Sequence, residues 1–547
     1  LFAGSETGMI DLNEKKIVSK GRLGPGEILG VRIEKGKVYS NDEIKNYLSK
    51  EYKHYNNQII DLDKKLEAET EKVELEGQSL RNFQHCFGYS IEDLELILHP
   101  MAEDAKEATG SMGDDTPLAV LSDKYRPLYH YFRQNFSQVT NPPIDSLREN
   151  KVMSLKTRFG NLGNILDFSK LTKDNIYVLN SPILSNAQFE KFLKFFGNNN
   201  KVLDCTFSKD DDLETSINLL KVKSEQAVRE GIKQIILSDK NISENRMPMP
   251  MLLCIGAINT HLVKLGLRGY VSINVQTGDA LDTHSFATLI GVGATTVNPY
   301  LAFDSLYQRH SKKLFGNFTF DECVSRYIKS VNLGLLKIMS KMGISVLSSY
   351  RGGCNFETVG LSRTIVKDYF PGMLSKISGI GLKGIEKKIR TIHKEAFFNN
   401  SNILPIGGIY RYRKNGETHQ YQGKLIHLLQ TAVGQGSYEI YKKYTKGIYN
   451  LNPISLRDLV DFKSKNPIDI SNVEPASNIL KRFGSGSMSH GALSKEAHET
   501  LAVGMNRIKG ASCSGEGGED EKRFKIMENG DSANSRVKQI ASARFGV

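Results

Sequence analysis

The fold class of this chain is decided by residues 234–275, which read QIILSDKNISENRMPMPMLLCIGAINTHLVKLGLRGYVSINV. Two short apolar segments, 234–237 and 271–275, enclose an apolar segment of helical length at 251–265. Short strands that alternate with longer helices are typical of a parallel sheet covered by helices. This stretch therefore predicts an α/β domain.

The same alternation continues on both sides of this stretch. Further strands are predicted at residues 175–179, 201–205, 295–297 and 344–347, and further helices at 213–230, 281–290 and 330–342. A new unit is predicted near the end of the chain, with strands at 485–489 and 538–542 around a helix at 494–506, for which Ser494 is a natural N-cap. No tandem repeat accompanies the pattern, so a solenoid is not expected.

The remaining segments are predicted as an N-terminal β segment and two connectors. Residues 1–55 have the pattern of β structure followed by a short helix. Residues 56–85 are mostly polar, and residues 405–475 mix Gly, Lys and Tyr, so both are predicted as connecting segments. The chain stops inside the apolar stretch Phe545-Gly546-Val547, which predicts a fragment of a longer protein.

Composition excludes several classes of protein. The 39% hydrophobic and 24% charged residues are ordinary for a globular protein, and the most apolar run, 247–258, is interrupted by Pro248 and Pro250. No membrane association is therefore expected. The net charge is +12, but the lysines are scattered, so nucleic-acid binding is not expected either.

Cysteine usage argues against a metal centre and against disulfides. The six cysteines lie far apart and form no Cys-x-x-Cys pair: Cys86, Cys205, Cys254, Cys323, Cys354 and Cys513. No metal ligands are predicted within these residues. A reducing compartment is the default, with the cytoplasm predicted and a plastid as the alternative.

A series of motifs resembles the glutamate synthase family, and in particular its large subunit. In chain order they lie at residues 5–8, 20–26, 87–89, 110–119, 138–145, 297–303, 349–352, 486–491 and 505–519. The resemblance covers nearly the whole chain in the family's order. It implies the end of an Ntn-type glutamine amidotransferase domain at 1–55, a linker at 56–85, a barrel-like central α/β domain at 86–404, a connector at 405–475, and the first part of a (β/α)8 FMN barrel at 476–547.

The resemblance also implies a reaction for the full-length protein. Ammonia released from glutamine would travel to the synthase domain and condense with 2-oxoglutarate to an imine, which reduced FMN would convert to glutamate. Electrons would come from an NAD(P)H-oxidising subunit or domain, or from ferredoxin, through a 3Fe–4S cluster whose ligands lie outside these residues. The fragment alone is expected to be inactive, because the glutaminase Cys is absent from it.

The flavin site is predicted at the end of the chain. Small residues at Gly486, Ser487 and Ser489 would let the backbone approach a flat ring closely, and the resemblance implies that Met488 touches both FMN and the oxo acid. The resemblance adds the following FMN-binding residues: Glu516, Gly517, Lys538, Gln539 and Ser542. Gln539 and Ser542 offer donors to ring atoms, and the charge of Lys538 would favour the reduced, anionic flavin.

Without the resemblance, these motifs have plainer interpretations. Residues 486–489 and 515–519 could be turns, and residues 538–542 a polar strand end. Two other functions also stay open, namely another FMN barrel oxidoreductase and a non-catalytic scaffold.

In the central domain, residues 276–279 follow a strand, where ligands often bind, but no acid–base pair or metal set accompanies them. The resemblance implies a central domain that serves as scaffold and tunnel wall, so Asn298, His284 and Arg351 are interpreted as structural or tunnel-lining. Asp114-Asp115 is interpreted as a loop or helix cap.

Overall fold

The computed structural model divides the chain into two compact units, Leu1–Leu459 and Val460–Val547. It describes residues 1–5, 8–24, 26–51, 59–68, 70–108, 110, 113–136, 144, 148–160, 175–398 and 403–540. Parts of the motifs at 5–8, 20–26, 110–119 and 138–145 lie outside the described residues, as do Ser542 and residues 545–547.

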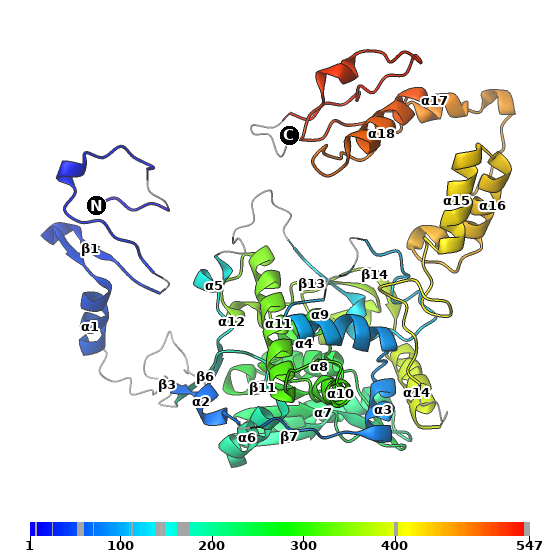
Figure 1. Cartoon of the computed structure of the whole chain (residues 1–547). Coiled ribbons are helices and arrows are strands. Elements are labelled where there is room, and N and C mark those ends of the chain that lie inside the picture. Colours follow the sequence, from blue (N-terminus) through cyan, green and yellow to red (C-terminus); the bar gives the residue numbers. More distant parts are fainter. Residues whose placement is uncertain are drawn as a thin grey trace. The chain divides into compact units, whose positions relative to one another are not determined.

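A four-stranded parallel sheet forms the centre of the first unit (Figure 1). Its strands, in spatial order, are β12 (Thr296–Asn298), β11 (Ser272–Gln276), β9 (Gln234–Ser238) and β7 (Asn200–Asp204). Successive strands are joined through α7 (Leu213–Arg229), α8 (Met251–Lys264) and α9 (Thr283–Val292). The mixed α/β class predicted from this alternation is confirmed.

The central strands form from apolar runs, and the central helices begin at residues whose side chains cap them. Ile235, Ile236 and Leu237 of β9 have no exposed surface, as expected for a strand covered on both faces. The helices begin at side-chain caps: Asp212 accepts from the backbone N–H of Thr215 at 2.8 Å, and Asp282 and Ser285 form a capping box at the start of α9.

A two-stranded sheet of β8 (Thr206–Ser208) and β10 (Arg246–Pro248) contributes Phe207 and Met247 to the core, and β1 (Gly30–Arg32) pairs with β2 (Lys37–Tyr39) in an antiparallel hairpin. The described residues of this unit also form two three-stranded sheets. One has the order β14 (Leu374–Ile380), β13 (Phe356–Leu361), β4 (Phe132–Gln134), and the other β3 (Ile59–Asp61), β6 (Ile176–Leu179), β5 (Thr157–Phe159). The strand predicted at 344–347 is wrong. Only a single bridge joins Ser154 to Val346, because α12 (Leu347–Tyr350) begins at the next residue.

The described residues of the first unit contain further α-helices. They are α1 (Asn41–Glu51), α2 (Leu62–Leu66), α3 (Gly77–Cys86), α4 (His99–Asp104), α5 (Glu149–Val152), α6 (Asn186–Phe196), α10 (Tyr300–Ser311), α11 (Phe320–Met342), α13 (Arg363–Tyr369), α14 (Leu382–Phe398), α15 (Gly423–Gln435) and α16 (Tyr438–Tyr449).

Both segments predicted as connectors contain ordered elements. In the first, Leu62 and Leu66 of α2 are fully buried and share a cluster with Phe159 and Phe192. A five-residue helix is too short to show helical periodicity among its charged neighbours, so its core residues are hidden in the sequence. In the second, α15 and α16 contact each other as a helical pair.

The second unit is built around α18 (Lys495–Arg507), preceded by the short α17 (Ala476–Leu480). Ser494 caps α18 by accepting from the N–H of Ala497 at 3.3 Å, which confirms the predicted helix start. The strand predicted at 485–489 is reduced to a parallel bridge from Gly484 to Ala511, because Gly and Ser lack the side chains that stabilise a strand. A second parallel bridge joins Cys513 to Val537.

Candidate functional site

Three distant segments of the second unit meet through a chain of side-chain hydrogen bonds. Ser487 Oγ donates to Gln539 Oε1 at 2.9 Å, and Gln539 Nε2 donates to Glu516 Oε1 at 3.1 Å. All three side chains belong to exposed residues. The structure thus brings together one predicted residue from each of the three motifs and leaves them open to a ligand.

A second contact joins the first two motifs through a side-chain hydroxyl and a backbone N–H. Ser489 Oγ accepts a hydrogen bond from the N–H of Gly517 at 3.1 Å. Gly515, with φ of +66°, lies so close to Met488 that an added Cβ would come within 2.6 Å of the Met488 carbonyl oxygen. Glycine is therefore required at 515 by both conformation and space.

We expect Gly515→Ala to lower the free energy of unfolding of the second unit by about 1–3 kcal/mol, because the new methyl group must displace the Met488 backbone. Denaturant unfolding measures this loss. Gly486→Ala is the matched control, since a Cβ there meets no atom within 4 Å. Equal stability of the two variants would contradict this account of Gly515.

The side chain of Lys538 already has partners within the second unit. Its Nζ contacts the carboxylate of Glu519 and the side-chain oxygen of Asn534, and it lies 5.0 Å from the ring centroid of Phe524. Burial raises the pKa of Glu519, but the hydrogen bonds from Lys538 and Ser535 and the charge of Arg523 outweigh it, so the pKa is lowered. The charge of Lys538 is therefore balanced by an ionised carboxylate.

Sequence reasoning missed a buried polar group beneath these motifs. His498 is 2% exposed and Arg523 is 5% exposed. His498 Nε2 lies 2.9 Å from the Met488 carbonyl oxygen, and Arg523 Nη1 lies 2.6 Å from His498 Nδ1. The available signal was His498 on the apolar face of the predicted helix, next to Ala497 and Leu501, but nothing local points to Arg523 as its partner.

In the described part of the first unit, a buried network of polar side chains lies at the carboxyl ends of the parallel strands. Asp239, which follows β9, accepts hydrogen bonds from Thr277 Oγ1, from the N–H of Gly278 at 3.1 Å and from Tyr300 Oη at 2.9 Å. Burial raises the pKa of Asp239 to about 7. Buried Asp279 and Asp304 show the same direction for the same reason, with pKa values of about 6 and about 7.

Protein side chains fill this end of the sheet. The ring of Phe87 lies so close to Gly278 that an added Cβ would come within 2.3 Å of it, and Tyr89 Oη donates to the Gly278 carbonyl at 3.1 Å. In α/β folds this edge of the sheet is the usual place for a ligand. Here the segment that contains Phe87 and Tyr89 fills it, which gives the network around Asp239 a structural role.

The other central residues singled out in the sequence also have structural contacts. Asn298 Nδ2 donates to the Leu184 carbonyl and to Asn186 Oδ1, both at 3.0 Å, and His284 Nε2 lies 3.0 Å from the Tyr129 carbonyl oxygen. Arg351 is half-buried, and this burial lowers its pKa.

The acidic pair at 114–115 organises loops. Asp114 accepts from the N–H of Thr116 at 3.0 Å, and Asp115 accepts from the N–H of Tyr421 at 3.0 Å and lies 2.8 Å from His419 Nδ1. Within the described ranges, no group of three or more His, Cys, Asp or Glu side chains is arranged to hold a metal ion.

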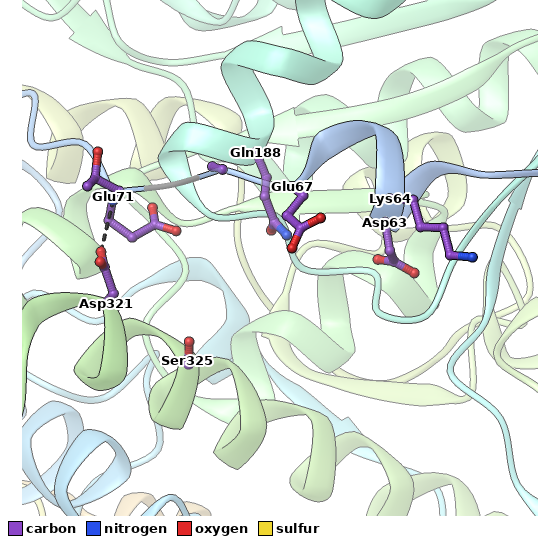
Figure 2. A pocket seen from close by; sticks show the side chains of 9 residues that line it. Asp63, Lys64, Glu67, Glu71, Gln188, Asp321 and Ser325 are labelled. Carbon is purple, nitrogen blue, oxygen red and sulfur yellow. Dashed lines mark hydrogen bonds between the residues drawn. The ribbon is translucent and has the colours of Figure 1, made fainter.

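A polar cavity of about 420 Å³ lies in the first unit (Figure 2). Its lining residues are Asp63, Lys64, Glu67, Ala68, Thr70, Glu71, Gln188, Asp321 and Ser325. Three of its carboxylates already accept backbone hydrogen bonds: Asp321 from the N–H of Glu71 at 2.9 Å, Asp63 from the N–H of Asn180 at 2.8 Å, and Glu71 from the N–H of Ala187 at 3.5 Å. The cavity therefore offers loop-organising carboxylates rather than a set of catalytic groups.

Three family models match the chain in the order that the sequence motifs predict. "Glutamine amidotransferases class-II" matches residues 1–57, "Glutamate synthase central domain" residues 82–362, and "Conserved region in glutamate synthase" residues 419–547. The central-domain model alone covers more than half of the chain. This chain belongs to the glutamate synthase family. The predicted flavin motifs at 486–539 lie within the third match.

Curated members of the glutamate synthase family align with the whole chain. The large chain of glutamate synthase [NADPH] from Azospirillum brasilense is 49% identical, that from Bacillus subtilis 41%, and the chloroplastic ferredoxin-dependent glutamate synthase 2 from Arabidopsis thaliana 39%. The chain spans 37%, 36% and 36% of the length of these three relatives.

Proposed function

We propose that the full-length protein containing this chain is a glutamate synthase. It makes two glutamates from glutamine and 2-oxoglutarate, with ammonia passing from a glutaminase domain to an FMN-dependent synthase domain. The single observation that carries this proposal best is the hydrogen-bond chain Ser487–Gln539–Glu516, which joins three predicted flavin motifs on an exposed surface. The family matches support the same order of domains.

In this proposal the chain contributes three parts. Residues 1–55 are the end of the Ntn-type amidotransferase domain, and residues 86–404 are the barrel-like central domain, reached through residues 56–85. Residues 405–475 lead to the start of the FMN barrel at 476–547. The filled strand ends around Asp239 and Phe87 support a central domain that acts as scaffold and tunnel wall. The parallel bridges Gly484–Ala511 and Cys513–Val537 suit the first strands of a barrel.

The residues present suit a flavin. Gln539 and Ser487 supply amide and hydroxyl groups that can exchange their mutual hydrogen bond for one to a heteroatom of the ring, and Gly486 leaves open space at its Cβ position. The proposed FMN-binding residues are Gly486, Ser487, Met488, Ser489, Glu516, Gly517, Lys538, Gln539 and Ser542, with Met488 also contacting the oxo acid. When bound, FMN supplies the hydride for reductive amination.

The remaining partners follow from the family. A 3Fe–4S cluster held by other parts of the full-length protein would carry electrons to FMN from NAD(P)H or ferredoxin. The relatives include an NADPH-dependent large chain and a ferredoxin-dependent enzyme, and the proposal includes NADH, NADPH and ferredoxin as donors. The cytoplasm stays the predicted compartment, with a plastid as the alternative. No helix in the described part of the chain has the length and hydropathy needed to cross a membrane.

The proposal is tested on the full-length protein. We expect about one FMN per synthase domain, and oxidation of NADPH, NADH or reduced ferredoxin that requires both glutamine and 2-oxoglutarate. If full-length protein bound no flavin, or oxidised the donor without either substrate, the proposal would be wrong.

Gln539→Leu should weaken FMN binding roughly fivefold to tenfold, the effect of losing about one hydrogen bond. Flavin fluorescence during titration measures the change. Gln430→Leu on α15 is the control, since Gln430 is also an exposed glutamine and lies outside the proposed site. Equal FMN affinity of the two variants would remove Gln539 from the site.

A further inference from the structure

A buried polar network lies directly behind the loops of the proposed flavin site. His498, Arg523 and the carboxylate of Glu519 are 2%, 5% and 2% exposed. Arg523 Nη2 lies 2.9 Å from Glu519 Oε1, and Arg523 also donates to the Ala533 carbonyl from Nε at 2.9 Å and from Nη2 at 2.8 Å. Buried charges are costly unless they are paired, and here each has a partner.

The geometry determines which nitrogen of His498 carries the proton. A guanidinium can only donate hydrogen bonds, so the His498 Nδ1 that faces Arg523 Nη1 at 2.6 Å must accept. A neutral imidazole that accepts at Nδ1 is protonated at Nε2. His498 Nε2–H therefore donates to the Met488 carbonyl oxygen at 2.9 Å, and Arg523 selects the tautomer that makes this bond.

Glu519 connects the same network to the third motif. Its Oε1 accepts from the N–H of Ser535 at 3.0 Å, and its Oε2 contacts Lys538 Nζ. A continuous path of polar contacts thus runs from Met488 through His498, Arg523 and Glu519 to Lys538. It joins the loops that follow both parallel bridges of this unit.

We propose that His498, Arg523 and Glu519 are positioning residues that hold the Met488 loop and Lys538 in the arrangement that binds the flavin. This inference rests on the proposed function, because the loop it positions is the proposed FMN site. The three residues act through Met488 and Lys538 and do not themselves contact the ligand. A network with a structural role alone would affect folding and leave flavin affinity and potential unchanged in folded variants.

Substitutions of His498 in the full-length protein separate these two roles. Gln has an amide that can donate to the Met488 carbonyl and accept from Arg523, whereas Leu can do neither and Asn is too short to span both contacts. We expect His498→Leu to weaken FMN binding roughly tenfold and His498→Gln to stay within about twofold of wild type. The FMN dissociation constant is measured by fluorescence on protein shown to be folded by circular dichroism.

Glu519→Gln gives a second readout. Removing the carboxylate leaves the charge of Lys538 unbalanced near the flavin, so the reduction potential of bound FMN should rise, as measured by spectroelectrochemical titration. Lys495→Gln is the control, because Lys495 forms exposed pairs with Glu499 and Asp520 outside this network, and it should leave the potential unchanged.

The outcomes distinguish the inference from the proposed function. Tight FMN binding by wild type, weak binding by His498→Leu and rescue by His498→Gln would support the inference. If His498→Leu does not fold, weaker binding by His498→Asn than by His498→Gln gives the same support. Equal affinity and potential in wild type and all folded variants would overturn the inference and leave the proposed function intact. A wild-type protein without flavin would overturn both.

Discussion

Replacing Arg126 with methionine is expected to lower the free energy of unfolding of the first unit by about 3–5 kcal/mol, because it leaves a buried carboxylate without its cation. Arg126 Nε lies 3.3 Å from Glu417 Oε2, and the two side chains are 5% and 3% exposed. Nη2 of Arg126 also donates to Thr116 Oγ1 at 3.1 Å and to the Pro117 carbonyl at 3.2 Å.

After the substitution, Glu417 keeps only neutral donors among its hydrogen-bond partners. Ser122 Oγ donates to it at 2.6 Å and the N–H of Thr418 at 2.9 Å, and neither group replaces a positive charge. The double variant Arg126→Met, Glu417→Leu should lose less stability than Arg126→Met alone, because no unpaired charge is left in the interior. Urea unfolding of wild type and variants measures both values.

An exposed ion pair provides the control. Arg482 and Glu474 form a close pair whose side chains are 63% and 44% exposed. Arg482→Met should cost at most about 1 kcal/mol, because water already solvates both charges. A loss of similar size for Arg126→Met would show that the pair between Arg126 and Glu417 does not hold the segment around Glu417 against the loop that contains Arg126.

The elements predicted correctly are those whose pattern is local. The strands β7, β9 and β11 are short apolar runs, and α18 follows its own N-cap, Ser494, so a window of about ten residues contains the information for each.

The attachment of residues 405–421 shows where such a window fails. Buried Glu92 accepts from the N–H groups of Ile409, Tyr410 and Arg411 at 2.6, 3.2 and 2.9 Å, more than 300 residues further along the chain. The loop can present these groups because Gly407 has a φ of +85°. Nothing local marks Glu92 as different from a solvated glutamate, so this segment was predicted as a plain connector.

In the candidate site, too, the distant contacts could not be predicted from local sequence patterns. Residues 486–489, 515–517 and 538–539 were identified through a family resemblance, because their local patterns equally suit turns and a polar strand end. The hydrogen bonds among Ser487, Gln539 and Glu516 add a spatial relation that no spacing in the sequence encodes. The partnership of His498 with Arg523 was missed for the same reason.

The second large effect concerns pH. The stability of the wild-type protein is expected to depend strongly on pH, and Asp239→Asn should reduce this dependence. Burial raises the pKa of Asp239 to about 7, whereas the pKa of an unfolded aspartate is about 3.9. Between these values the folded state binds more protons than the unfolded state, so the stability of wild type falls as pH rises from about 4 to about 7. At roughly 1.4 kcal/mol per pKa unit, Asp239 contributes a decrease on the order of 2–4 kcal/mol.

Asparagine resembles the protonated aspartate in shape but does not titrate. Asp239→Asn should therefore match wild type near pH 4 and exceed its stability by about 2 kcal/mol or more at pH 8, as measured by urea unfolding at a series of pH values. Buried Asp279 and Asp304, whose pKa values are raised in the same direction, keep part of the slope in the variant. Exposed Asp210→Asn should leave the wild-type profile unchanged. Parallel profiles for Asp239→Asn and wild type would show that Asp239 is ionised in the folded protein throughout this range, held so by Thr277, Gly278 and Tyr300.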